Sequence, residues 1–81
     1  MRATAKGSVN PVSDMVRFRE GKNRLLRMSP VDAQAVRGAS ELIKSMREFA
    51  LEYGMYANQL LEWEVELLDA FPEAEQTDNK P

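Results

Sequence analysis

Large apolar side chains recur at alternating steps of four and three residues through the second half of the chain. At about 100° per residue, this spacing places them within an arc of roughly 100° on one face of an α-helix. A single helix cannot cover such a face, so we expect other helices to pack against it. The stripe consists of Leu42, Met46, Phe49, Tyr53, Tyr56, Leu60, Trp63 and Leu67.

Residues that favour helix ends flank this stripe. Ser29 can cap a first turn, Pro30 fits the first helical position, and Asp32 favours the positive end of the helix dipole. Pro72 cannot continue a helix and restricts the residue before it. We therefore predict one long helix over residues 30–71, about 60 Å in length.

Gly54 is the position at which this helix could break. Glycine costs roughly 1 kcal/mol relative to alanine in a helix interior. However, residues 55–57 offer no capping side chain, and the stripe continues past Gly54 without a phase shift. We favour a continuous helix that bends at Gly54, and a helical hairpin broken near Gly54 is the alternative.

The segment over residues 14–28 supports two interpretations. Val16 and Phe18 alternate with arginines, as in a strand with one exposed face. Residues 21–23, Gly-Lys-Asn, have turn chemistry, which favours a β-hairpin. The alternative is a short amphipathic helix, which the glycine and asparagine in its middle would weaken.

The length of 81 residues indicates one domain at most. Residues 1–13 are small and polar, so we predict a flexible arm, and residues 72–81 lack apolar periodicity, so we predict a disordered tail. The domain then spans residues 14–71. A chain of this size buries only about 60% of its unfolded surface, which makes a monomer marginal, and it has no cysteine for a disulfide.

The spacing of the stripe also predicts assembly, because four-three repeats form the seams of coiled coils and helical bundles. The apolar face is widened by Ile43, Leu61 and Leu68. Along one edge run the small residues Ala50, Gly54 and Ala57, where a partner backbone could approach closely. We expect an oligomeric helical bundle, preferably a homodimer, with the stripe and Glu64 as its protein interface.

Glu64 falls inside the apolar arc, where a carboxylate buried alone would be costly. One interpretation places it at the rim of the face, with its carboxylate in solvent. The other pairs it with Arg24 or Arg27, from the same chain or a second one. Such a pair would set register more than stability.

The net charge of −2 conceals a strong asymmetry, with +5 over residues 1–29 and −7 over residues 30–81. The basic residues near the N-terminal side are Arg17, Arg19, Lys22, Arg24 and Arg27. In a hairpin they would form a ribbon able to lie against a phosphate backbone. Alternatively, they are neutralised by an acidic ridge of the chain itself, made of Glu41, Glu48, Glu52 and Glu66.

Residue types typical of catalysis are scarce. The chain has no histidine and no cysteine, the commonest general base, nucleophile and zinc ligands. Its four glycines are scattered, so no phosphate-binding loop is present. Glu62, Glu66 and Asp69 share helical spacing, but a solvated face explains them better than a metal site. We expect no enzyme activity, no cofactor and no metal.

These features predict a small helical interaction protein, an adaptor or inhibitor. It would self-associate and dock on a larger protein through the aromatic face or the acidic ridge. The alternative is a nucleic-acid-binding regulator that uses the basic segment over residues 17–27. No apolar run approaches membrane-spanning length, and residues 1–8 lack the apolar core of a signal peptide, so the expected location is the cytoplasm.

Overall fold

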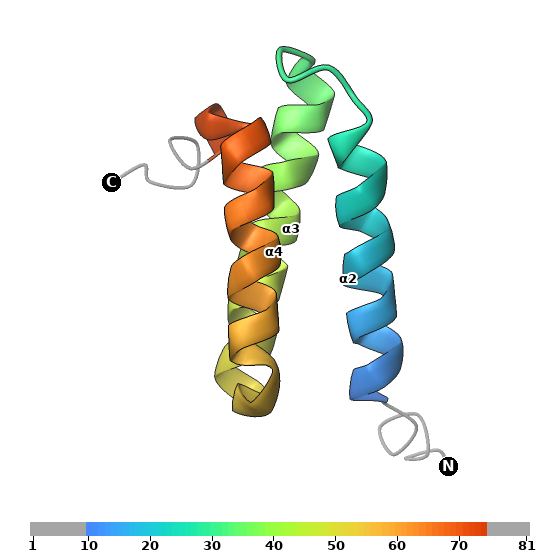
Figure 1. The fold of residues 1–81 in the computed structure, drawn as a ribbon, viewed down its shortest axis with the longest axis vertical. Coiled ribbons are helices and arrows are strands. Elements are labelled where there is room, and N and C mark those ends of the chain that lie inside the picture. Colours follow the sequence, from blue (N-terminus) through green and yellow to red (C-terminus); the bar gives the residue numbers. More distant parts are fainter. Residues whose placement is uncertain (1–9, 75–81) are drawn as a thin grey trace.

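The structure, a computed structural model, describes residues 10–74, and the secondary structure of this part is helical, with no strand (Figure 1). The elements are α2 (Pro11–Leu26), α3 (Ala33–Glu52), the short 3₁₀ turn η1 (Gly54–Tyr56) and α4 (Ala57–Ala70). The prediction of a mainly α protein is therefore confirmed.

The three long helices alternate in direction and lie side by side (Figure 1). α3 runs antiparallel to α2, and α4 returns antiparallel along α3. Each of the three helices contacts the other two, so α2 packs across the pair formed by α3 and α4. The result is a three-helix arrangement within one chain.

α2 replaces the β-hairpin that the sequence favours over residues 14–28, so that prediction is wrong and its helical alternative is confirmed. The helix has a well-formed start. The side chain of Asn10 accepts a hydrogen bond from the backbone N–H of Val12 at 2.9 Å, and Pro11 occupies the first turn. These end signals lie just before the segment whose alternation suggested strands, and they favour a helix through it.

Packing explains why α2 tolerates a glycine in its middle. Phe18 packs edge-on against Phe49 of α3, with ring centroids 5.2 Å apart. One turn later, Gly21 lies beside Leu42, and two turns later Leu25 reaches Gly38. A Cβ at position 38 would lie 3.1 Å from the Leu25 side chain, so glycine there lets α2 and α3 approach closely. This tertiary contact outweighs the low helix propensity of the segment.

The predicted arm and tail are both shorter than expected within the described residues. α2 begins at Pro11, so the predicted arm over residues 1–13 overlaps the helix. At the other end, residues 72–74 form a further helical turn, and Ala74 is buried. The backbone N–H of Ala74 donates to the carbonyl of Phe71 at 2.9 Å. The remainder of both predictions, residues 1–9 and 75–81, lies outside the described residues.

The predicted helix start is also displaced. Residues 29–32 form a turn, in which the Asp32 N–H donates to the Ser29 carbonyl at 3.1 Å. Asp32 then caps α3, accepting a hydrogen bond from the Gln34 N–H at 2.9 Å. α3 therefore begins at Ala33 rather than at Pro30, because the carboxylate of Asp32 takes the role predicted for Ser29.

The continuous helix over residues 30–71 is wrong, and the alternative of a hairpin broken near Gly54 is confirmed. α3 ends at Glu52, and Tyr53 leaves the helical region with φ −122° and ψ 73°. The turn η1 then reverses the chain into α4. The four-three spacing continues across the break because the part of the stripe on α3 and the part on α4 each present their apolar residues to the other part.

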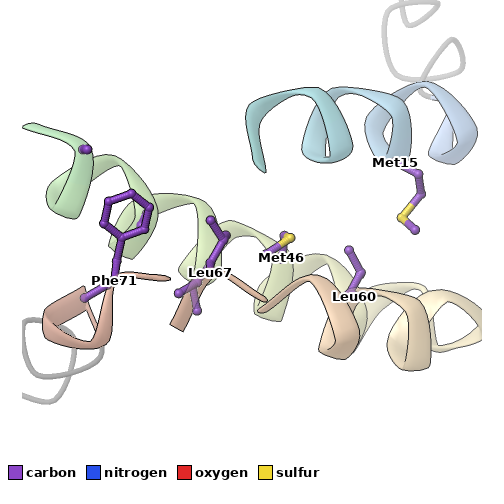
Figure 2. Packing of buried hydrophobic residues seen from close by; sticks show 9 residues of the cluster. Met15, Met46, Leu60, Leu67 and Phe71 are labelled. Carbon is purple, nitrogen blue, oxygen red and sulfur yellow. The ribbon is translucent and has the colours of Figure 1, made fainter. Parts of the chain in front are cut away.

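The core lies between α3 and α4 and is closed by α2. Met46 of α3 faces Leu60 and Leu67 of α4, while Met15 approaches from α2 (Figure 2). Phe71 closes the far end of this row. The buried apolar residues among those described are Met15, Ala35, Ala39, Ile43, Met46, Leu60, Leu67, Phe71 and Ala74.

We predict that Met46→Ala lowers the free energy of unfolding by about 2–4 kcal/mol, because it leaves a cavity in the centre of this core. Val31→Ala, at an exposed position in the turn before α3, should change it by less than about 0.5 kcal/mol. Urea unfolding followed by circular dichroism compares the two. Equal losses would contradict the assignment of Met46 to the core.

Candidate functional site

The predicted interface stripe is covered by the protein's own helices. Met46, Leu60 and Leu67 are fully buried. The other apolar members are partly buried, and they are Leu42, Phe49, Tyr53, Tyr56 and Trp63. α2 and the reversal at η1 bring these side chains together within one chain, so the stripe does not form an exposed aromatic face.

The aromatic residues gather at the end of the bundle where the chain reverses. The ring of Phe49 lies 4.6 Å from that of Tyr53 and 6.1 Å from that of Tyr56, centroid to centroid. Phe18 of α2 completes the group through its edge-on contact with Phe49. Such ring contacts stabilise a fold beyond the effect of the buried surface area alone. Here they hold the chain reversal against α2.

Lys22 of the basic segment lies inside the bundle, with a relative exposure of 6%. Its ammonium nitrogen lies 2.8 Å from a carboxylate oxygen of Glu66 on α4, and it also donates to Asn23 at 3.0 Å. The ammonium lies 6.0 Å from the centre of the Trp63 ring, within cation–π range. Lys22 therefore joins α2 to α4 and is not presented to a ligand.

Arg17, Arg19 and Arg24 lie on the exposed side of α2, and Arg27, the C-cap residue of this helix, is exposed as well. Arg17 pairs with Asp14 one turn earlier, at 2.7 Å. Within residues 10–74, no salt bridge involves Arg19, Arg24 or Arg27. The exposed surface of α2 is therefore basic, and the predicted neutralisation by the acidic ridge is limited to the Lys22–Glu66 pair.

The acidic ridge is divided between two helices. Glu41, Glu48 and Glu52 are exposed on α3, whereas Glu66 projects from α4 toward α2. The reversal of the chain separates them, because a single ridge of all four requires the continuous helix. The structure thus does not bring the four carboxylates together.

Glu64 pairs with Arg47 of α3 rather than with Arg24 or Arg27. One carboxylate oxygen of Glu64 accepts from Nη2 of Arg47 at 2.7 Å and from Nε at 3.2 Å. The Glu64 side chain is 14% exposed, so the arginine neutralises a carboxylate that is largely removed from water. This pair joins α4 to α3.

An apolar groove lies beside this ion pair, between the end of α3 and the start of α4. Its free volume is about 390 Å³. The small side chains Ala50 and Ala57 leave this space, and the buried residues Met46 and Leu60 contribute to its floor. Leu51, Asn58 and Leu61 also line the groove, and Arg47 and Glu64 complete the lining.

The groove is flanked by large apolar side chains that stay in water. Leu51 of α3 is 88% exposed and Leu61 of α4 is 58% exposed. Val65, one turn beyond Leu61, is 56% exposed, and Met55 in η1 is also exposed. Scattered exposed apolar residues are normal, but here Leu51 and Leu61 line the same hollow.

Sequence reasoning identified part of this groove. The small edge at Ala50 and Ala57 was predicted to admit a partner backbone, and both residues line the hollow. The predicted interface does not include Leu51, because that residue lies off the four-three stripe. Its position beside Leu61 depends on the chain reversal, so no helical period along a single rod could have joined them.

Other site classes find no support in the part of the chain that the structure describes. No group of three or more carboxylates is placed to hold a metal ion. None of the helices there combines the length and apolar character needed to cross a bilayer.

A scan against protein-family models and searches of curated proteins and solved structures found no match to this chain.

We predict that Glu66→Gln lowers the free energy of unfolding by about 1–2 kcal/mol, because it leaves the buried Lys22 ammonium without an opposite charge. Lys22→Met should cost less, because a similar apolar side chain can fill the same space. Urea unfolding at neutral pH measures both values. A larger loss for Lys22→Met would show that the aliphatic stem and ring contact of Lys22 matter more than its charge.

Proposed function

We propose that this protein is a non-enzymatic interaction protein, an adaptor or inhibitor, that binds an apolar helical segment in the groove between α3 and α4. The observation that carries the proposal is the exposure of Leu51 and Leu61 beside a hollow that the small side chains of Ala50 and Ala57 leave open. Small residues below and large apolar residues beside a hollow suit an amphipathic helix that inserts its apolar side chains.

Energetics support this choice of surface. Burying an exposed leucine contributes about 1.5–3 kcal/mol, and the groove offers two such residues close together. The volume of about 390 Å³ falls within the range of pockets that bind ligands. The Arg47–Glu64 pair borders the apolar surface and supplies the polar feature that would orient a bound segment.

The binding experiment uses a photo-reactive amino acid at position 51, introduced into the full chain in cells that contain the protein. We expect irradiation to give a discrete protein adduct, because Leu51 stands at the groove and its replacement contacts the bound segment. Adding Leu61→Glu should suppress the adduct strongly, since a carboxylate would then enter the apolar contact. Mass spectrometry identifies the cross-linked chain and shows whether it is another protein or a second copy.

The matched control carries the same photo-reactive group at position 12, because Val12 is exposed on α2, away from the groove. We expect no discrete adduct there. Equal adducts from positions 12 and 51, or an adduct at position 51 that survives Leu61→Glu, would contradict docking in this groove. Circular dichroism of each variant confirms that the helices are retained.

A second candidate function is nucleic-acid binding by α2. It is favoured by the exposed arginines of that helix and its C-cap, three of which form no salt bridge within residues 10–74. Arginines contact phosphates with little dependence on sequence, and such binding weakens as salt concentration rises.

This second function predicts a measurable salt effect. Fluorescence anisotropy of a labelled DNA duplex should give an affinity that falls about tenfold or more between 50 and 200 mM salt. Replacing Arg19, Arg24 and Arg27 by glutamine should abolish most of the binding, while Leu61→Glu should leave it unchanged. Absence of binding at about 50 mM salt would exclude this candidate.

A further inference from the structure

The geometry points to a second copy of this chain as the occupant of the groove, in a two-fold dimer that places α3 of each copy over α4 of the other. This inference rests on the proposed function, since it names the partner of the same surface. Three properties of the open face support it, where the open face is the side of the α3–α4 pair opposite α2.

The first property is the number of helices. α2 covers one face of the pair formed by α3 and α4, and the opposite face carries the groove and the exposed residues Leu51, Leu61 and Val65. Two such pairs placed face to face form an antiparallel four-helix bundle, a stable packing for helices with apolar faces. The α2 helices would then cover the two outer sides.

The second property is self-complementarity. A two-fold interface uses the same patch on both copies, so the patch must hold both a projection and a space. The exposed Leu51 and Leu61 are projections, and the hollow above Ala50 and Ala57 is a space. The open face therefore contains both halves of the contact that a dimer requires.

The level of a residue, meaning its height along the common axis of the helices, also agrees with this arrangement. The Arg47–Glu64 pair places these two residues level with each other, and α3 and α4 run in opposite directions with equal rise per residue. Leu51 is consequently level with Leu60 and Leu61. A two-fold axis parallel to the helices preserves these levels, so Leu51 of each copy meets Leu61 of the other.

The third property is charge. Lys44 lies two turns before Leu51 on the open side of α3, and Asp69 lies one turn after Val65 on α4. Both side chains are exposed. Lys44 is level with Leu67, so the same two-fold rotation brings it within one turn of Asp69 of the other copy. Opposite charges at the edge of the contact favour this orientation over one that places α3 against α3.

The mass of the full chain, measured by sedimentation equilibrium, tests the inference. We expect the 9.2 kDa chain to double in mass with a dissociation constant in the micromolar range, because the patch is small. Leu61→Glu should weaken the dimer about tenfold or more. Val12→Glu, an equal change at an exposed position of α2, should have no effect.

Charge reversal tests the orientation. Lys44→Glu and Asp69→Lys should each weaken the dimer about three- to tenfold, and the double variant should recover most of the loss. Glu20→Lys on the exposed side of α2 controls for a general effect of charge. Weakening without recovery in the double variant would overturn the placement of α3 over α4.

The remaining outcomes separate this inference from the function on which it rests. A chain that keeps a mass of 9.2 kDa up to about millimolar concentration would overturn the second copy as occupant. A dimer that is indifferent to Leu61→Glu would overturn it as well. In either case, an adduct with a different protein at position 51 would still support docking in the groove.

Discussion

The structure depends on the burial of one long apolar stripe, because a single straight helix cannot cover its own apolar face. The stripe from Leu42 to Leu67 would stay exposed on a straight rod of this chain. By reversing at Tyr53–Tyr56, the chain places the first half of the stripe against the second half. The cost of ending one helix and starting another is a few unsatisfied backbone groups. The burial of Met46, Leu60 and Leu67 outweighs that cost, because each contributes about 1.5–3 kcal/mol.

The two polar pairs inside this arrangement set how the helices meet. Apolar contacts alone allow helices to slide by a turn, since leucine and methionine side chains adapt to several neighbours. Arg47 and Glu64 fix α3 against α4, and Lys22 and Glu66 fix α2 against α4. Each pair contains one group that is largely buried, so shifting the register by a turn would leave a charge in an apolar environment.

The sequence predicted which residues are buried better than it predicted how the chain runs. The helical period, the apolar character of the stripe and the special position of Glu64 follow from spacing alone. The reversal at Tyr53 does not, because Gly54 keeps a negative-φ backbone and no capping side chain marks the helix end. Whether the chain forms one straight helix or a helical hairpin depends on burial between residues that are far apart in the sequence. Local residue types do not encode such contacts. The same cause explains α2, where packing on Phe49 and Gly38 decides against the strand pattern.

The reversal that buries the stripe also creates the surface on which function is proposed. Folding α4 back along α3 brings Leu51 beside Leu61 and opens the hollow above Ala50 and Ala57. A three-helix chain of this size has little stability in reserve, because small domains bury a modest share of their surface. Any partner that binds the folded state adds stability by mass action. Occupying the groove would therefore favour the reversed conformation, because a straight helix separates Leu51 from Leu61 and has no groove to occupy.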